Sequence, residues 1–314
     1  MKMYLTQKVG CEAKRQQGVA IILVLLIVAL ATSLAAYMAL QQNLWQRQVE
    51  SQFERAQARQ LGLAGIDWAR AILAEDVRGG NVDHEKEIWT LKLPPVPIEG
   101  GEVIGAIDDR QGLFNLNNAV TNVAQFRRLL DALGLPADLA PSLVDWLDAD
   151  DQALAGGAED AYYLALPQPY RAANQPLVEL GELAKVKGFD SRVIESLRAF
   201  VTVLPPDRAR ISTPVNVNFA PAEVLVAIIE GLSLSDARLL VQQRKGQPYK
   251  DIADFKQRLP QGGMKVVDND ISVKSEYFWV TGRASIGKAQ IVTHTMLYRG
   301  SSSNWPTIVW QSVQ

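Results

Sequence analysis

A long apolar run near the N-terminus dominates the hydrophobic pattern of this chain. Residues 19–44 contain no charged side chain, and the stretch from Val19 to Leu40 is almost entirely aliphatic. A helix rises about 1.5 Å per residue, so this stretch is long enough to cross a hydrocarbon core of about 30 Å. The hydrophobic core of a cleaved secretory signal is usually shorter, about 7–15 residues. On the pattern alone, the simplest prediction is a single membrane-spanning helix.

The charges on either side of this run predict its orientation. Arg47 is the first charge after it, and only Glu12 opposes the cations that precede it. Those cations are Lys2, Lys8, Lys14 and Arg15. The positive-inside rule therefore keeps the N-terminus in the cytoplasm and carries the remainder of the chain across the membrane.

Helical periodicity continues well beyond the apolar run. Apolar residues recur at roughly helical spacing from Leu44 to Leu73, with polar side chains between them, and no proline occurs between Val19 and Arg78. The pattern predicts one helix of about 55–60 residues that is apolar in its first half and amphipathic in its second. Gly79-Gly80-Asn81 is expected to end it.

The rest of the chain reads as a strand, a helical centre and then further strands. Residues 91–97 predict an extended linker, Gly101–Asp109 a strand, and residues 110–119 a turn. The centre, about residues 119–259, is expected to be helical. Its expected helices cover residues 123–133, 140–148, 176–186, 190–201, 220–232 and 234–244. The expected C-terminal strands cover 276–285, 289–299 and 307–313, the first two forming a hairpin.

This order predicts an α+β fold in which the long N-terminal helix lies on an antiparallel sheet. A large all-α domain would be inserted between the first strand and the remaining strands. A weak internal repeat supports a separate helical domain, since Phe114-Asn115-Leu116-Asn117 resembles Val215-Asn216-Val217-Asn218. We expect these asparagines to cap or brace turns.

Composition argues against some classes of function. The formal net charge is −2, and proteins that bind polyanions such as nucleic acids usually carry a net positive charge. The only cysteine is Cys11. The histidines, His84 and His294, belong to no recognisable catalytic motif, so we predict that the protein is not an enzyme.

An acidic loop carries the most distinctive chemistry. Asp148, Asp150, Gln152 and Glu159 stand at positions 1, 3, 5 and 12 of a twelve-residue calcium loop, although Ala153 replaces the usual glycine. Zinc is disfavoured, because no histidine or cysteine is near. On the residues alone, a solvated acidic loop remains the alternative.

Residues 231–259 raise a nucleic-acid alternative, because they resemble a helix-hairpin-helix. That motif grips phosphate through glycine-rich hairpins, whereas this hairpin reads "LSLSD". The neighbouring charges nearly balance, so we interpret the motif as a packing unit with no nucleic-acid partner.

The basic leader, the glycine, the apolar run and the continuing amphipathic helix together resemble the type IV pilin class. The resemblance implies that prepilin peptidase cleaves after Gly18 and that Val19 is then N-methylated. Pilins of this class usually carry a glutamate five residues after the cut, where this chain has Leu23. A subunit without that glutamate would suit the tip of a fibre.

Further motifs resemble the minor pseudopilin K family of type II secretion systems. They are "FNLN", "DWLDADD", "GGAEDAYY", "PYRAANQPL", "ELGEL" and "VNVNFAPAEVL". The resemblance implies an inner-membrane protein with a periplasmic domain, located at the pseudopilus tip with minor pseudopilins I and J. It would help initiate pseudopilus assembly and protein export. It also implies structural Ca²⁺ in the helical domain, with Asp160 and Asn174 as further candidate ligands.

The resulting domain prediction has four parts. Residues 1–18 form the cleaved leader and 19–44 the transmembrane helix. Residues 45–110 and 270–314 form a pilin-like domain, and 111–269 the inserted helical domain. The alternative function is a minor pilin of a type IV pilus or DNA-uptake system, with the helix-hairpin-helix-like region binding nucleic acid.

Overall fold

The computed structural model describes residues 17–80, 82–92, 94–206, 210, 212–260, 262–300 and 305–314. Most of the leader, including Cys11, lies outside these residues, as does Asn81. Gly18 and Val19 lie in the first turn of a helix, and the Val19 side chain is exposed.

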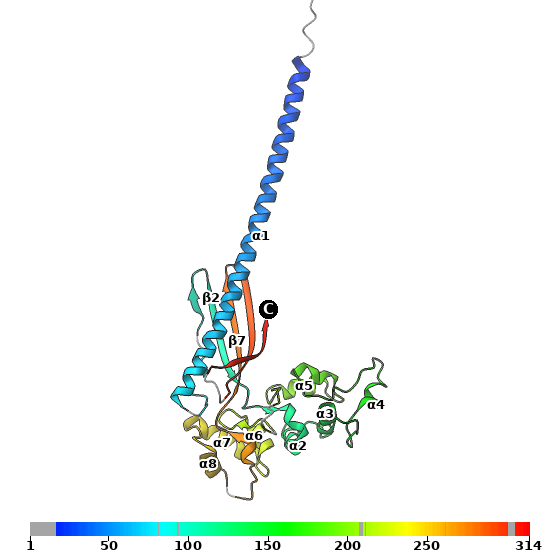
Figure 1. The fold of residues 1–314 in the computed structure, drawn as a ribbon, viewed down its shortest axis with the longest axis vertical. Coiled ribbons are helices and arrows are strands. Elements are labelled where there is room, and N and C mark those ends of the chain that lie inside the picture. Colours follow the sequence, from blue (N-terminus) through cyan, green and yellow to red (C-terminus); the bar gives the residue numbers. More distant parts are fainter. Residues whose placement is uncertain are drawn as a thin grey trace, which may run out of the picture.

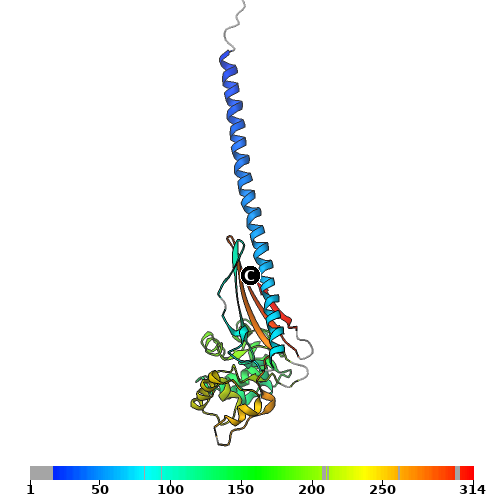
Figure 2. The same cartoon turned by 90° about the vertical axis from the view of Figure 1, so that its left-hand side faces the viewer.

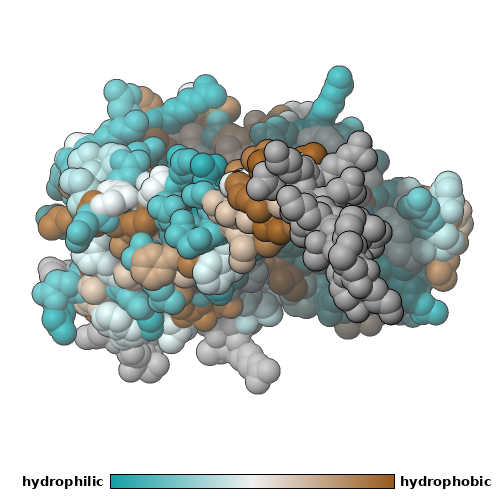
Figure 3. Space-filling view, turned by 90° about the horizontal axis from the view of Figure 1, so that it is seen from above, coloured by the Kyte–Doolittle hydropathy of each residue, from teal (hydrophilic) through white to brown (hydrophobic). Residues whose placement is uncertain are grey.

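One continuous helix, α1 (Gln17–Gly79), confirms the unbroken helix and the end expected from the sequence, and its 63 residues slightly exceed the expected 55–60. Its first half projects away from the rest of the molecule, whereas its second half lies along the sheet (Figures 1 and 2). Residues 18–52 are all exposed, and burial begins only beyond them. Among the helices that the structure describes, α1 is the one that is long and apolar enough to span a membrane. Figure 3, seen from above, shows apolar residues near the centre of the view and hydrophilic residues interspersed with apolar ones over the rest of that face.

The sheet that receives α1 has five antiparallel strands in the order β1-β2-β7-β8-β9. They are β1 (Val96–Ile98), β2 (Gly101–Asp109), β7 (Tyr277–Ile286), β8 (Ala289–Tyr298) and β9 (Thr307–Val313). The expected extended linker at 91–97 is wrong at its end, where β1 pairs with β2. The inserted segment therefore follows the second strand of the sheet, where the sequence placed it after the first.

The face of the sheet that packs on α1 has its own small apolar core. Ile66, Ala69 and Leu73 of α1 contact Phe278 of β7 and Leu297 of β8 in one buried cluster. Because side chains alternate along a strand, their neighbours in β7 and β8 point to the opposite face. That opposite face carries the aromatic residues discussed below.

All the remaining α-helices lie between β2 and β7, at the far end of α1 from its apolar half (Figure 1). The α-helices are α2 (Val123–Ala132), α3 (Leu139–Leu147), α4 (Asp160–Tyr163), α5 (Ser191–Leu197), α6 (Ala222–Ile228), α7 (Leu234–Gly246) and α8 (Ile252–Gln257). The 3₁₀ helices are η1 (Ile88–Thr90), η2 (Leu116–Val120), η3 (Leu180–Lys185) and η4 (Asp268–Asp270), of which η1 precedes β2.

Two expectations for this segment need correction. The expected helix at 176–186 is the 3₁₀ helix η3, held at its start by a reciprocal capping box between Glu179 and Glu182. Nor is the segment all-α, because it contains two short parallel ladders. β3 (Phe114–Asn115) pairs with β4 (Val201–Thr202), and β5 (Val215–Asn216) pairs with β6 (Ile271–Ser272). Runs of two residues are too short to show alternation in a sequence.

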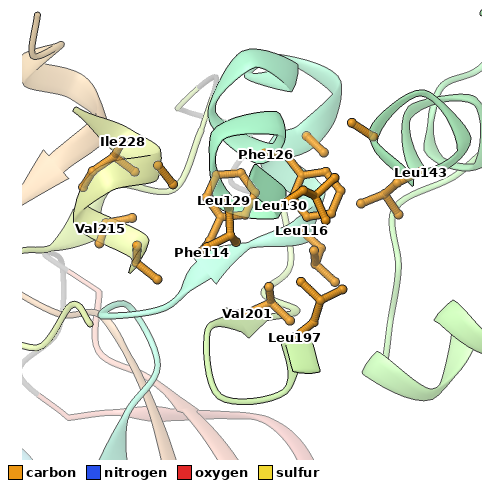
Figure 4. Packing of buried hydrophobic residues seen from close by; sticks show 14 of the residues in the cluster. Phe114, Leu116, Phe126, Leu129, Leu130, Leu143, Leu197, Val201, Val215 and Ile228 are labelled. Carbon is orange, nitrogen blue, oxygen red and sulfur yellow. The ribbon is translucent and has the colours of Figure 1, made fainter. Parts of the chain in front are cut away.

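The two-residue strands meet in the main hydrophobic core, shown in Figure 4. Phe114 stacks on Phe126 of α2 with ring centroids 5.8 Å apart. Leu129 and Leu130 of α2 are fully buried in the same cluster, and so is Leu143 of α3. The core thus joins α2, α3, α5 and α6 into one packed body.

The asparagine repeat performs the bracing role expected of it. The Asn115 carboxamide oxygen accepts from the backbone N–H of Asn117 at 3.2 Å, and Asn216 accepts from Asn218 at 2.9 Å in the same way. Gly134 and Gly231, which follow the helices after each repeat, have φ of +66° and +87°. Glycine reaches this left-handed region without steric cost, so Gly134 ends α2 directly after its C-cap, and Gly231 turns the chain two residues beyond the C-cap of α6.

Candidate metal centre

The acidic loop connects two helices that aromatic packing holds together. Its first candidate ligand, Asp148, follows α3 directly, and its last, Glu159, precedes α4. Trp146 of α3 meets Tyr163 of α4 edge-on, with ring centroids 5.1 Å apart. This contact between large buried rings brings the two ends of the loop side by side.

Three carboxylates converge at these ends. One oxygen from each of Asp148, Asp150 and Glu159 lies within 4.8 Å of the others. Ca²⁺ takes oxygen ligands at about 2.3–2.6 Å, so two ligands of one ion are at most about 5 Å apart. The spacing therefore permits all three carboxylates to reach a single ion, as their places in the sequence predicted.

Several oxygens in this group are buried without a partner. They are Oδ1 of Asp148, both carboxylate oxygens of Glu159, and the carboxamide oxygen of Asn174. Glu159 itself is only 4% exposed. Burying a polar group without a hydrogen bond costs about 1–3 kcal/mol. A set of unpaired oxygen acceptors with no donor among them fits a hard cation.

Asn174 reaches the loop from a distant part of the chain. Its backbone N–H donates to the Trp146 carbonyl at 3.0 Å, and its φ of +45° is unusual for a residue other than glycine. Its amide nitrogen donates to the Asp150 carbonyl at 3.2 Å and to Asp151 Oδ1 at 3.3 Å. The side chain is thus fixed against the loop while its oxygen stays free.

Mutual repulsion and burial shift the protonation of these acids. Desolvation, followed by the charges of Asp145, Asp148, Asp151 and Asp150, raises the pKa of Glu159 to about 7. Desolvation also raises the pKa of Asp148, with repulsion from Asp150 next. Among the described residues, no Lys or Arg forms an ion pair with Asp148, Asp150 or Glu159. A divalent cation would remove this repulsion.

Two candidate ligands stand apart from the converging group. Gln152 is exposed, and its backbone N–H donates to Asp150 Oδ1 at 2.9 Å. Both oxygens of Asp160 are engaged, one by Arg171 and the other by the Ala172 N–H, each at 2.9 Å. Asp160 therefore serves as an anchor for the following loop in this structure.

Asp145 is a residue that sequence reasoning missed. It is completely buried, and both its oxygens accept from the Leu154 N–H, at 3.2 and 3.1 Å. A Cβ at Gly157 would lie 1.9 Å from Asp145 Oδ2, so only glycine fits there. The i,i+3 spacing from Asp148 along α3 was the available signal, because it places both carboxylates on one side of the helix.

In a second acidic cluster, a side chain of the protein itself neutralises the carboxylates. Asp76, Asp83 and Glu87 also bring carboxylate oxygens within 4.8 Å of one another. Here Arg299 lies between them, with Nη1 2.9 Å from Asp76 Oδ2 and Nη2 donating to Asp83. A guanidinium supplies the positive charge in this cluster, so we assign it no metal.

Comparisons with known proteins agree on one family. Two sequence-family models, both described as Type II secretion system (T2SS), protein K, match residues 112–206 and 215–274. The Type II secretion system protein K of Pseudomonas aeruginosa is 35% identical over 91% of this chain and 89% of its own length. This chain belongs to the type II secretion system protein K family. The protein K of Pectobacterium carotovorum is 31% identical over 90% of this chain and 93% of its own.

The architecture is shared with a solved member of the protein K family. The chain resembles a structure titled as the GspK-GspI-GspJ complex from the enterotoxigenic Escherichia coli Type 2 Secretion System, with a TM-score of 0.72 at 24% identity. The match covers 85% of this chain and 99% of that one. This likeness confirms the expected pilin-like fold. The acidic loop and Asn174 both fall within the first matched segment, residues 112–206.

Proposed function

We propose that this protein K is a minor pseudopilin located at the tip of the pseudopilus, where it helps initiate assembly and protein export. The supporting observation is that the folded part of the chain is attached to only one end of α1. The apolar half is exposed along its whole length, while the helical segment lies at the opposite end (Figure 1). Such a helix can leave lipid for a bundle of similar helices at little net cost, because both surroundings are apolar.

The position of the helical segment supports a location at the tip of the pseudopilus. A subunit added beyond this one, on the side away from the membrane, would have to pack beside the C-terminal half of α1 and the sheet, where the helical segment between β2 and β7 lies (Figure 1). Leu23 is neutral and 55% exposed, so it offers no charge to a neighbouring subunit's N-terminus. We propose accordingly that prepilin peptidase cleaves after Gly18, that Val19 is methylated, and that α1 anchors the protein in the inner membrane with its head in the periplasm.

The partners we propose are minor pseudopilins I and J, which are named with GspK in the related complex. The test is co-expression of the full chain with both partners in membranes, followed by purification through a tag on this chain. We expect all three to elute together from detergent at micromolar concentration. Recovery of the chain without either partner would contradict the proposal, and omission of one partner at a time shows which contact is direct.

We also propose a structural Ca²⁺ held by Asp148, Asp150 and Glu159, with the Asn174 oxygen as a further ligand. The support is the convergence of the carboxylates together with their unpaired, buried oxygens. The ion would pin a loop that charge repulsion otherwise opens. It has no catalytic role in this proposal, in line with the prediction that the protein is not an enzyme.

Two cations of the helix-hairpin-helix-like region, Arg244 and Arg258, are engaged by other groups of this chain, which supports the proposal over nucleic-acid binding. Arg244 is 5% exposed, and one of its guanidinium nitrogens donates to the carbonyls of Val217 and Ala220. Arg258 pairs with Asp254 at 2.6 Å. Phosphate contacts need free cations at the surface. Salt-dependent binding of duplex DNA by the full chain would contradict this interpretation.

A further inference from the structure

A cleft of about 680 Å³ lies between the sheet and the helical segment, on the face of the sheet opposite α1. Its floor carries Trp279 of β7 and Trp310 of β9, and its opposite wall includes Val178, Val203 and Pro206. Sites that bind ligands usually have volumes of about 300–1,000 Å³ and mostly apolar walls with a few polar groups. This cleft has both properties, and it is distinct from the acidic loop.

The floor is a row of stacked rings. Trp279 stacks on Trp310 with centroids 5.4 Å apart and an interplanar angle of 16°, and on His294 at 5.8 Å and 26°. Trp310 is still 44% exposed, and Val178 on the facing wall is 76% exposed. Large apolar side chains left in water on two facing walls mark a surface that another molecule covers.

One cation at the floor lacks a matching anion. The Arg110 guanidinium lies over the Trp279 ring, 5.2 Å from its centroid, and its Nε is buried with no hydrogen-bond partner. Burial lowers the pKa of Arg110, and the charges of Asp108 and Asp109, which precede it, only partly oppose this; among the described residues no carboxylate forms an ion pair with it. Arg198, at the rim, already pairs with Glu195. Glu179 also lines the cleft, but its side chain accepts from the backbone N–H of Glu182 in the capping box. The Arg110 guanidinium is therefore available to a carboxylate of a bound molecule.

We propose that this cleft docks an extended segment of a partner protein in which an Asp or Glu lies between apolar residues. The carboxylate would pair with Arg110, and the apolar side chains would cover Trp310 and Val178. The Trp279–Trp310 separation of 5.4 Å and the Arg110–Trp279 separation of 5.2 Å place Arg110 and Trp310 within about three residues of extended chain.

The position of the cleft favours a peptide over a lipid. Trp279 follows Phe278, which packs on Leu73 near the C-terminal end of α1. The apolar run ends near Leu44, so roughly 45 Å of helix separates the cleft from the lipid-spanning part. A lipid headgroup at the bilayer surface cannot reach it. A soluble polypeptide can.

The test uses the full chain in lipid nanodiscs and a phage-displayed library of random octapeptides. Selection is run against the unmodified chain and, in parallel, against Val178→Asp, whose exposed position should leave folding intact. We expect the unmodified chain to enrich peptides with one acid flanked by apolar residues, and Val178→Asp to lose that enrichment through repulsion. Val178→Lys is the matched control and should retain it.

The enriched peptide and its acid-to-amide counterpart are then compared by fluorescence anisotropy. We expect the amide form to bind about tenfold more weakly, and Arg110→Gln to abolish that difference. Arg238→Gln, an exposed arginine elsewhere in the helical segment, should change nothing. Several results would overturn the proposal: no enrichment, enrichment without an acid, or equal binding to Val178→Asp. Concentration-dependent self-association that Val178→Asp blocks would assign the cleft to a second copy of this chain instead.

Discussion

Calcium binding to the acidic loop should change both the stability of the protein and its dependence on pH. The perturbation is Glu159→Gln, which keeps the shape of the side chain and removes one buried charge. Glu159 is the most informative position because both its oxygens are buried and unpaired. Asp148 and Asp150 remain in this variant, so any loss of calcium binding reports on one ligand.

The magnitude follows from linkage. A ligand that binds only the folded state adds about 2.7 kcal/mol at one hundred times its dissociation constant. For a protein of this size, 1 kcal/mol moves the melting temperature by roughly 2–4 °C, so calcium should raise it by roughly 5–11 °C. Glu159→Gln should lose most of that gain. Without calcium the variant should be at least as stable as the parent, because it relieves the repulsion.

The pH dependence without metal has a definite sign. Burial raises the pKa of Glu159 from an ordinary 4.5 to about 7 in the folded state. A raised folded pKa stabilises the fold at low pH and loses that contribution as pH rises through the folded value. Stability in chelator should therefore fall between about pH 4.5 and 7, by up to about 3 kcal/mol from this group. Saturating calcium should abolish this fall, because it holds the carboxylate ionised.

The assay is thermal melting of the full chain in detergent, followed by circular dichroism, with calcium or chelator at several pH values. Glu195→Gln is the matched control, since Glu195 is an exposed residue of α5 that lies outside the loop and pairs with Arg198. It should melt like the parent in every condition. Equal calcium shifts in the parent and in Glu159→Gln would refute the assignment, and a stability that rises with pH in chelator would refute the electrostatic reasoning.

Three further predictions address the fold and the membrane segment. Arg299→Met should lower the free energy of unfolding by about 3–5 kcal/mol in urea titration, because it strands the buried carboxylate of Asp83 and the partly buried one of Asp76; a loss under 1 kcal/mol would contradict this. Gly157→Ala should weaken calcium binding, measured by titration, because its Cβ collides with Asp145, whereas Gly246→Ala, which meets no neighbouring atom, should have no effect. Leu23→Glu should leave the melting temperature unchanged but alter fibre initiation, and unaltered initiation would remove the argument from this position.

The pattern of apolar and polar residues along the sequence was sufficient to predict the long helix and the longer strands of the sheet. Unbroken helical periodicity predicted α1 to its final glycine, and alternation predicted β2 and β9 at their observed bounds. These elements are long enough for a periodicity of 3.6 or 2 to be visible. The short elements lacked that advantage. The two-residue strands of the inserted segment form because the surrounding core brings them together, so their formation is a tertiary effect.

The candidate metal centre was predictable only where its residues are close in sequence. Spacing within the loop identified Asp148, Asp150 and Glu159, which the structure brings together. The spacing of a twelve-residue calcium loop also suggested Gln152 as a ligand, but its side chain is exposed. Asp160 was suggested by resemblance, and its engagement by Arg171 depends on how a later loop folds back. Chain reversals of that kind leave no local signal.

A buried network of hydrogen bonds and ion pairs joins the end of α1 to the sheet and the helical segment. Asp83, just beyond α1, accepts from the Ser275 N–H at 2.7 Å, and its backbone carbonyl accepts from Asn216 at 3.3 Å. Asn216 also donates to Ser275 Oγ at 2.8 Å, and Arg299 joins Asp83 to the end of α1. This buried network links the membrane helix, the sheet and the helical segment through one acidic side chain. Because buried polar networks tolerate little relative movement, a displacement of α1 along its axis must carry the helical segment and its cleft with it.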